Sequence, residues 1–365
     1  MQIFHVIHAL EQWAPLAYQE GYDNSGLLVG DRNIDCTGVL VSLDVTEAVL
    51  DEAIKKKCNL IVAHHPIIFK GIKKINGNTY VERIIMKAIK HDVAIYAIHT
   101  NLDNVIDGVN HALAEKLGLE NTAILQPTNN LLNKLYTFVP PTHKEVVLSA
   151  LFKAGAGHIG NYSECSFGIS GTGTFLPTEG TRPFSGIIGT RSSEAEEKIE
   201  VIFPSYLKNI VIEALLNIHP YEEVAYDIVE LKNYFQNVGA GLIGYLPEPI
   251  EETAFLRNLK IIVGTPFFRH SPLSGKKISK VAICGGAGVF LTEAAIRAKA
   301  DIFVTADIKY HDFFEPDGRI ILADIGHWES EQFTIDRILT FLTEKFPTFA
   351  LLKTEVKTNP VEYFI

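Results

Sequence analysis

Short apolar, β-rich runs alternate with helical patterns in the first and last thirds of the chain, and this alternation limits the possible folds most. The first third predicts strands at 39–43, 60–63 and 93–98 and helices at 47–57, 81–90 and 110–117. The last third predicts strands at 280–284, 302–305 and 320–324, a helix at 292–299 and a long helix at 330–346. Apolar strands that alternate with helices are typical of a mostly parallel sheet covered on both faces. We therefore expect an α/β fold.

The two outer thirds also resemble each other. The segment DEAIKKKCNLIVAHH, which starts at Asp51, aligns without gaps on EAAIRAKADIFVTAD, which starts at Glu293, so that His65 falls on Asp307. Further along, an acid follows a histidine by four residues in both copies, in HTNLD and in HWESE. Two matches in the same order predict an internal duplication, with two half-domains facing each other across a cleft.

The segment between the outer thirds has a different texture. Strands are predicted at 134–139, 198–203 and 223–229, and helices at 144–154 and 207–217. Further strand is predicted between the first helix and the strand at 198–203. A βαββαβ order over about one hundred residues is typical of a ferredoxin-like α+β domain that can fold alone. We predict a discontinuous core, residues 1–130 and 232–365, with an inserted domain at 131–231. Within it, GISGTGTFLPTEGT from Gly168 is predicted to be a mobile loop between strands.

Composition excludes several classes of protein. The net charge of -10 argues against a generic DNA or RNA binder, which grips phosphates with Lys and Arg. The four cysteines are widely separated and form no CxxC pair, so reduced, buried thiols are expected rather than disulfides or metal–thiolate clusters. The first residues do not resemble a signal peptide, and no apolar run reaches membrane-spanning length. These features predict a cytoplasmic protein.

Histidines and acids follow the ends of predicted strands. His64 and His65 come directly after the strand at 60–63, and the carboxyl ends of parallel strands are where such sheets bind ligands. Asp103 lies just past another strand; its alternative role is to cap a helix that starts near 105. His327 and Glu331 are four residues apart and share one face if a helix has begun. The alternative for a single strand-end histidine is a solvated side chain, but a doubled histidine with partners favours metal ligands.

Neutral imidazoles with two carboxylates suit Zn, Mn, Fe, Co or Ni better than Ca or Mg. Five donors are too many for one four-coordinate ion and too few to saturate two, so we predict two divalent ions with Glu331 contacting both. Such a pair can activate water for attack on a substrate. His99 and His311 are candidates for proton transfer. Asp307 and His311 are candidates for contacts with the ligands or the substrate.

Two glycine-rich segments have a simpler interpretation than nucleotide binding. Residues 285–288 follow a strand but lack the spacing of a phosphate-binding turn, so we predict a loop that lines the metal cleft. Residues 239–244 match GxGxxG, yet Tyr245, Leu246 and Pro247 follow. This context indicates a continuing strand.

Several segments together resemble the Nif-three-like family, whose bacterial members are called GTP cyclohydrolase I type 2 homologues. They are YDNSGLLVG (from Tyr22), AHHPIIF (from Ala63), HTNLD (from His99), TADIKYHDFF (from Thr305) and GHWESE (from Gly326). The segment IHPYEEVAYDIVEL, from Ile218, is similar to the PII-like or CutA-like domain of longer members. The resemblance implies a dinuclear centre on His64, His65, Asp103, His327 and Glu331, all of the expected residue type. It also implies a toroidal homohexamer of stacked trimers.

Two functions are compatible with these features. The first is a metal-dependent hydrolase that acts on a nucleotide or phosphoester, with GTP ring opening implied by the resemblance. The alternative is a metal-binding regulatory or chaperone-like assembly with little turnover, whose insert senses a ligand as PII-like domains do. Turnover on small molecules distinguishes the two.

Overall fold

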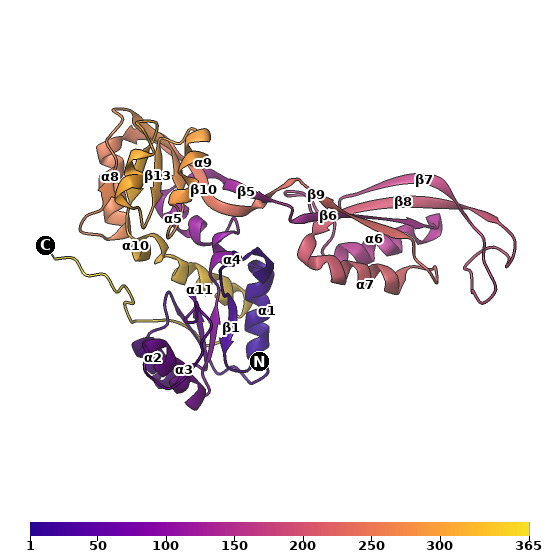
Figure 1. Cartoon of the computed structure of the whole chain (residues 1–365), viewed down its shortest axis with the longest axis horizontal. Helices are drawn as coiled ribbons and strands as arrows, with labels where there is room; N and C mark the ends of the chain where they lie inside the picture. Colours follow the sequence, from indigo (N-terminus) through magenta and orange to yellow (C-terminus); the bar gives the residue numbers. More distant parts are fainter. Residues whose placement is uncertain (365) are drawn as a thin grey trace. The chain divides into compact units, whose positions relative to one another are not determined.

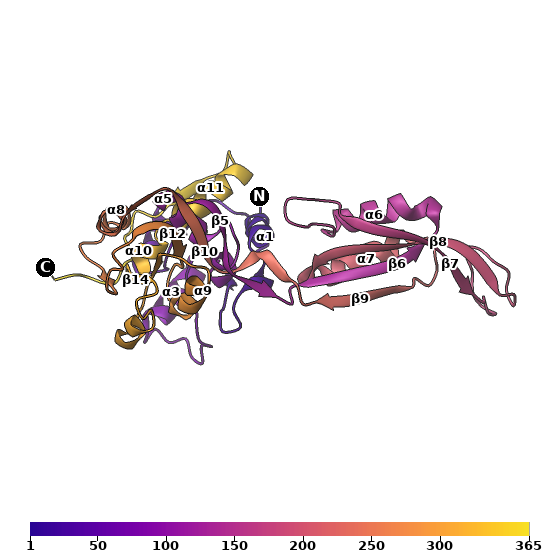
Figure 2. The ribbon, with the colours of Figure 1, turned by 90° about the horizontal axis from the view of Figure 1, so that it is seen from above.

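The computed structural model describes residues 1–364 and has a mixed α/β fold with three sheets (Figures 1 and 2). The chain divides into two compact units. We call Met1–Gln126 with Asn237–Ile365 the core unit, and Pro127–Gln236 the inserted unit. The predicted boundaries, 131 and 231, lie inside the inserted unit.

The first sheet of the core unit has five strands in the order β1-β4-β3-β2-β15. Its strands are β1 (Gly26–Val29), β2 (Val39–Ser42), β3 (Leu60–Ala63), β4 (Ala94–Ala97) and β15 (Leu351–Lys353). The helices in this part of the sequence are α1 (Ile3–Trp13), η1 (Leu16–Tyr18), α2 (Glu47–Lys55), α3 (Tyr80–Lys90), α4 (Thr100–Asp103) and α5 (Val109–Leu117). Of these, α5 packs against β12 of the second sheet. Strands β15, β2, β3 and β4 run parallel, and β1 is antiparallel at the edge. Every residue of β2, β3 and β4 is buried, as expected for strands covered on both faces.

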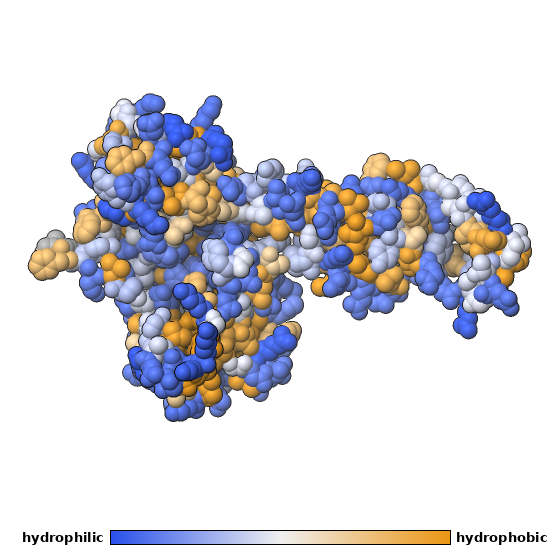
Figure 3. All heavy atoms as spheres, in the orientation of Figure 1, coloured by the Kyte–Doolittle hydropathy of each residue, from blue (hydrophilic) through white to orange (hydrophobic). Residues whose placement is uncertain are grey.

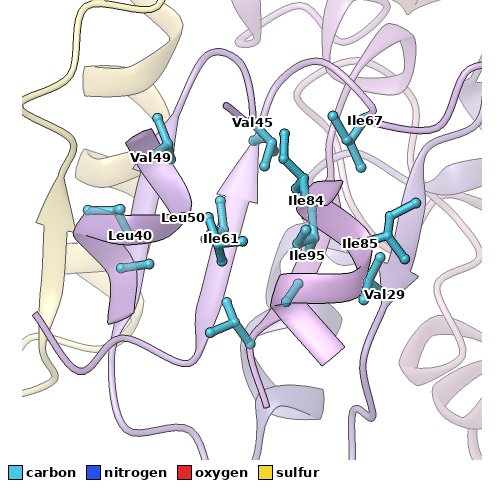
Figure 4. Close-up of a cluster of buried hydrophobic side chains, with 14 of the residues drawn as sticks. Val29, Leu40, Val45, Val49, Leu50, Ile61, Ile67, Ile84, Ile85 and Ile95 are labelled. Atoms are coloured by element: carbon cyan, nitrogen blue, oxygen red, sulfur yellow. The ribbon is translucent and has the colours of Figure 1, made fainter. Parts of the chain in front are cut away.

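Apolar residues of α2 and α3 pack against this sheet. Figure 4 shows Leu50 from α2 and Ile84 from α3 beside Ile61 and Ile95 from the central strands. All four side chains are fully buried. Both helices begin at a threonine whose side chain accepts a backbone N–H of the first turn, which satisfies a donor that the helix itself leaves free.

The second sheet has six strands in the order β11-β14-β13-β12-β10-β5. They are β5 (Glu120–Asn129), β10 (Tyr234–Glu251), β11 (Arg269–His270), β12 (Lys277–Ile283), β13 (Ile302–Thr305) and β14 (Ile321–Asp324). The helices in this part of the sequence are α8 (Glu252–Val263), η4 (Val289–Leu291), α9 (Thr292–Arg297), η5 (Tyr310–Phe314), α10 (His327–Glu331) and α11 (Thr334–Lys345). Of these, α11 packs against β15 and β2 of the first sheet. Strands β12, β13 and β14 run parallel, and β10 and β11 are antiparallel.

The two core sheets repeat one topology. Each has three adjacent parallel strands, β2-β3-β4 and β12-β13-β14, with an antiparallel strand beside the third. The aligned residues Lys57 and Lys299 both have a positive φ, 58° and 57°, in the turn that follows α2 or α9. The same left-handed turn therefore leads into the same strand in both halves, in agreement with the sequence repeat.

The inserted unit has the order β6 (Leu132–Val139), η2 (Pro141–His143), α6 (Lys144–Lys153), β7 (Ser166–Phe175), β8 (Ser192–Pro204), η3 (Ser205–Leu207), α7 (Lys208–Ile218) and β9 (Tyr226–Leu231). Its four strands form an antiparallel sheet in the order β7-β8-β6-β9. Apolar residues of α6 and α7 share one core with alternate residues of β6 and β8. This is a βαββαβ arrangement.

One predicted helix is two helices. The segment 330–346 was expected to form a single helix, but α10 ends at Glu331 and α11 begins at Thr334. Between them, the Gln332 side chain donates a hydrogen bond to the carbonyl oxygen of Val263. The two helices therefore differ in role. Helix α10 carries the predicted ligands His327 and Glu331, whereas α11 contributes buried Ile335, Ile338 and Leu342 to the core.

The predicted loop from Gly168 is also wrong in its first half. Residues 166–175 form β7, which pairs without interruption with β8 from Ser166↔Val201 to Phe175↔Ser192. The ladder of backbone hydrogen bonds outweighs the low strand preference of glycine. The loop begins only after Phe175.

Two expectations from composition concern the burial of the cysteines and membrane-spanning helices. Cys36, Cys58 and Cys284 are buried free thiols, and Cys165 is a partly exposed one. Burial raises the pKa of Cys36 to about 11. Within residues 1–364, every helix is too short or too polar to cross a membrane.

Candidate metal centre

Strand ends and one short helix place the predicted ligands in the core unit. His64 and His65 follow β3, Asp103 ends α4 just past β4, and His327 and Glu331 begin and end α10, which follows β14. The prediction that His327 and Glu331 share a helical face is confirmed, since Nε2 of His327 lies 3.2 Å from Oε2 of Glu331. Asp103 does not cap the next helix, because Gly108 occupies the cap position of α5.

Glu331 belongs to two groups of donors. In one, Nε2 of His64 lies 3.7 Å from Oδ1 of Asp103 and 3.9 Å from Oε1 of Glu331. In the other, Nε2 of His65 lies 3.0 Å from Oε2 of Glu331 and 3.3 Å from Nε2 of His327. Each group has three potential ligand atoms within 4.8 Å of one another. The carboxylate of Glu331 is therefore shared, one oxygen facing each group.

The imidazole rings are held from behind. Nδ1 of His64 donates to the carbonyl oxygen of Ile98, and Nδ1 of His65 donates to Oδ1 of Asp44, both at 2.8 Å. Nδ1 of His327 donates to Oδ2 of Asp307 at 2.7 Å. Because each Nδ1 carries the donated proton, Nε2 is the atom that can present a lone pair to a cation.

The buried charges at the site shift several pKa values. Burial lowers the pKa of His65, but the hydrogen bond to Asp44 and the negative charges of Glu331 and Asp44 outweigh burial and raise the pKa to about 10. The pKa of His327 rises to about 11 in the same way, through Asp307 and Glu331. Burial raises the pKa of Asp103. Burial also acts to raise the pKa of Glu331, but the adjacent imidazoles outweigh it and hold that pKa well below its usual range. A divalent ion must displace the imidazole protons, so its binding weakens as pH falls.

Three atoms in this cluster are buried without a hydrogen-bond partner: Nε2 of His64, Oδ1 of Asp103 and Oε2 of Glu331. Buried polar atoms in native proteins are normally satisfied, so such a set in one place needs a missing partner. All three can ligate a cation, and the set as a whole offers imidazole nitrogens and carboxylate oxygens. The residues therefore fit a divalent transition-metal ion.

The loop after β12 borders the same carboxylate. An ideal Cβ on Gly286 would lie 2.5 Å from Oε1 of Glu331 and 3.3 Å from the His327 ring. Gly286 also has a φ of 62°, a conformation that other residues adopt at a cost of about 1–2 kcal/mol. Gly285 and Gly286 of the predicted loop therefore lie beside Glu331, whereas Gly288 contacts Cys284 and Thr305.

We expect Gly286→Ala to weaken metal binding by about tenfold or more. The new methyl group would displace the Glu331 carboxylate, which both donor groups share. Metal affinity measured with a fluorescent competitor checks this. Gly71→Ala is the matched control, since its Cβ would meet nothing within 4 Å. Equal affinity of both variants would show that the loop does not support the site.

The other predicted residues fall in two places. The His99 ring lies 5.2 Å from that of His64 and 5.4 Å from that of His65, and its Nδ1 donates to Oδ1 of Asp23 at 2.7 Å. His311 is exposed on η5, where its ring contacts Tyr310 and Phe314 rather than the donor groups. Asp307 holds His327, as a supporting residue would.

Sequence reasoning missed Asp44 and Asp23, which orient His65 and His99. Asp44 lies two residues after the end of β2, close to the strand-end position that identified His64 and His65. That signal was available in the sequence. Asp23 follows no strand, and only the tertiary structure brings it to His99.

A cavity of about 480 Å³ adjoins the second donor group. Its lining includes His65 and His327, and the rings of Phe267, Trp328 and Tyr363 form an aromatic wall. The carboxylate of Glu329 anchors this wall, because its Oε1 accepts hydrogen bonds from Asn359 and Tyr363. The cavity is large enough for a small organic molecule next to the donors.

Comparison with known proteins places the chain. The family model for Duf34/NIF3 (NGG1p interacting factor 3) matches residues 1–360. The chain belongs to this family. Two curated relatives, both called GTP cyclohydrolase 1 type 2 homolog, come from Halalkalibacterium halodurans and Bacillus subtilis. The first is 46% identical over 84% of this chain and 82% of its own length, and the second 37% identical over 98% and 97%.

Solved structures agree with the family assignment. A Bacillus cereus protein related to NIF3 is 38% identical, has a TM-score of 0.87, and matches 100% of this chain and 99% of its own. A Staphylococcus aureus protein is 31% identical with a TM-score of 0.80, over 100% and 99% of the two chains. The resemblance found in the sequence motifs is thus confirmed at the level of family and fold.

Proposed function

We propose that this chain binds two divalent metal ions and uses them to hydrolyse a small molecule of the nucleotide or phosphoester class. The observation that carries the proposal is the shared carboxylate of Glu331, with one donor group facing each of its oxygens. His64 and Asp103 would hold one ion, and His65 and His327 the other. Five protein donors leave positions open for water and substrate on both ions.

The ions, when bound, would supply Lewis acidity toward water and a substrate oxygen. The chain contributes the rest. Asp44 and Asp307 keep the rings of His65 and His327 in the tautomer that directs Nε2 inward. Asp23 does the same for His99, whose remaining nitrogen is placed beside the two strand-end histidines to hold or release a proton. We propose His99, rather than His311, for this role because of that position.

The neighbouring cavity supports a small organic substrate. Its aromatic wall offers flat apolar surfaces, and its lining includes Arg269, whose side chain is 58% exposed although its guanidinium also forms an ion pair with Asp324. A planar ring and an anionic group would both find complementary partners there. The name GTP cyclohydrolase 1 type 2 homolog, carried by the curated relatives, is compatible with such a substrate.

A turnover screen tests the hydrolase. Protein loaded separately with Zn, Mn, Fe, Co or Ni is incubated with GTP, other nucleotides and simple phosphoesters, and release of formate and phosphate is measured. We expect at least one substrate to turn over, and His65→Ala to lower that rate by about 100-fold or more. The alternative, a regulatory or chaperone-like assembly, is favoured if wild type and His65→Ala show the same background rate on every substrate.

We also propose that the inserted unit folds separately from the metal-binding unit. All five proposed ligands lie outside it, and the strands through which the chain leaves and returns, β5 and β10, are hydrogen-bonded neighbours in the second sheet. Replacing 131–231 by a short linker is therefore expected to give soluble protein that binds metal with affinity within about threefold of wild type. Insoluble protein, or folded protein without metal, would show that the insert is integral.

The kinship of the insert with PII-like or CutA-like domains and the homohexameric assembly remain predictions from the resemblance. The native mass in solution, compared with 40.5 kDa for one chain, tests the hexamer. A monomeric mass would exclude it.

A further inference from the structure

The inserted unit contains a second cavity, of about 350 Å³. It is formed by residues of β6, β7 and β8, by the loop after β7 and by the segment after α7. Where β7 ends and β8 begins, Figure 3 shows hydrophobic residues beside hydrophilic ones on the surface. Leu176 and Phe184, in the loop between these strands, are exposed apolar side chains. The metal centre and the proposed hydrolysis make no use of this cavity.

Aromatic rings form much of its wall. Phe138, Phe175, Phe184 and Tyr221 all line the cavity, and the rings of Phe184 and Tyr221 lie 5.9 Å apart. Tyr221 also packs edge-on against buried His219, at 5.0 Å. Such rings present negative faces that attract cations.

The segment after α7 is firmly held. Nε2 of His219 lies 3.0 Å from the carbonyl oxygen of Phe138 and donates to it, and Nδ1 accepts the backbone N–H of Tyr221. Burial lowers the pKa of His219, which keeps the ring neutral and able to do both. The motif IHPYEE thus fixes Tyr221 at the cavity.

A carboxylate is built into the same wall. Oε1 of Glu196 accepts a hydrogen bond of 2.8 Å from the hydroxyl of Tyr221. Its Oε2 lies over Gly173, where an ideal Cβ would come within 2.0 Å, so glycine leaves the room that the carboxylate occupies. Glu222 and Glu223 add two further carboxylates to the lining.

The cavity has no basic side chain in its described lining. The nearby Lys144 and Lys198 form ion pairs with Glu197 and Glu200. The backbone N–H of Arg182 donates a hydrogen bond of 2.8 Å to Oε2 of Glu222. Three carboxylates among aromatic rings therefore remain without a cationic partner inside the cavity, and an anion there would be repelled.

We propose that this cavity binds a small organic cation, an ammonium or guanidinium joined to an apolar group. The charge lies against Glu196 and the ring of Tyr221, and the apolar part lies between Phe138, Phe175 and Phe184. A bare metal ion would leave the aromatic wall unused, and a neutral apolar molecule would leave the carboxylates unpaired. The proposal is independent of the hydrolase activity, since every residue that carries it lies in the inserted unit.

Calorimetric titration of the full chain with three matched probes tests the proposal. They are 2-phenylethylammonium, 2-phenylethanol and 3-phenylpropionate, which are cationic, neutral and anionic. We expect the cation to bind most tightly and its affinity to fall as salt is raised. Glu196→Gln should weaken that binding by about tenfold, as loss of a charged partner does. Glu213→Gln, which makes the same change on the exposed face of α7, should leave it within about twofold.

Phe184→Ala gives a second measurement that keeps every charge. It should weaken the cation and the alcohol by similar factors, because it removes part of the apolar wall that both use. Thermal unfolding confirms that each variant is folded. The proposal is overturned if the alcohol or the propionate binds as tightly as the cation, if no probe binds saturably, or if Glu196→Gln and Glu213→Gln bind the cation equally.

Discussion

Replacing Glu331 with Gln is expected to release both metal ions from the chain. The substitution keeps the size of the side chain but removes its charge and one good ligand oxygen. Because Oε1 faces His64 and Oε2 faces His65, both donor groups lose a ligand at once. Residues that only orient metal ligands already contribute about 10–100-fold in affinity, so loss of a shared ligand should exceed about 100-fold for each ion. Elemental analysis after exhaustive dialysis measures the occupancy.

Three variants serve as controls for that result. His64→Ala should deplete mainly one ion and His65→Ala mainly the other, because each histidine belongs to a different group with Glu331. Glu344→Gln makes the same chemical change at an exposed position of α11 and should retain both ions. One ion per wild-type chain, or full double occupancy in Glu331→Gln, would contradict the shared-carboxylate arrangement.

Phe303→Ala is expected to lower the free energy of unfolding by about 3–5 kcal/mol. Phe303 is fully buried in the middle of β13, where it pairs with Ala282 of β12 and Leu322 of β14. A parallel strand covered on both faces cannot move aside to fill the space, so most of the cavity should persist. Chemical denaturation of metal-free protein gives the change without a contribution from bound ions.

Phe290→Ala is the matched control for this substitution. Phe290 lies in η4 of the same half and is 65% exposed, so the same truncation removes little buried surface. We expect a change within about 0.5 kcal/mol. A similar loss for both variants would mean that the packing of the second sheet does not limit stability.

The two halves of the metal centre are supported unequally. Asp44, which holds His65, accepts a second hydrogen bond of 2.5 Å from Thr358. Asp307, which holds His327, has a side chain that is 51% exposed and a φ of 55°. The group around His327 therefore has weaker support, although the two halves share one topology.

Local sequence pattern determined much of the core. Apolar four-residue strands such as 60–63 can be recognised because burial on both faces demands an unbroken apolar run. The repeat between the outer thirds follows from the sequence because both copies need the same left-handed turn before the same strand. The strand-end position of His64 and His65 could likewise be predicted from the sequence, since it depends only on where β3 ends.

Only the tertiary structure decided the rest. Glu331 lies more than two hundred residues from His64, and the packing of α10 against the first half turns one oxygen toward each donor group. The break after Glu331 and the strand through Gly168–Phe175 also escaped the sequence, because each depends on hydrogen bonds to partners far along the chain. The local preference of each residue cannot predict such contacts, because the hydrogen-bond partners lie in other parts of the sequence.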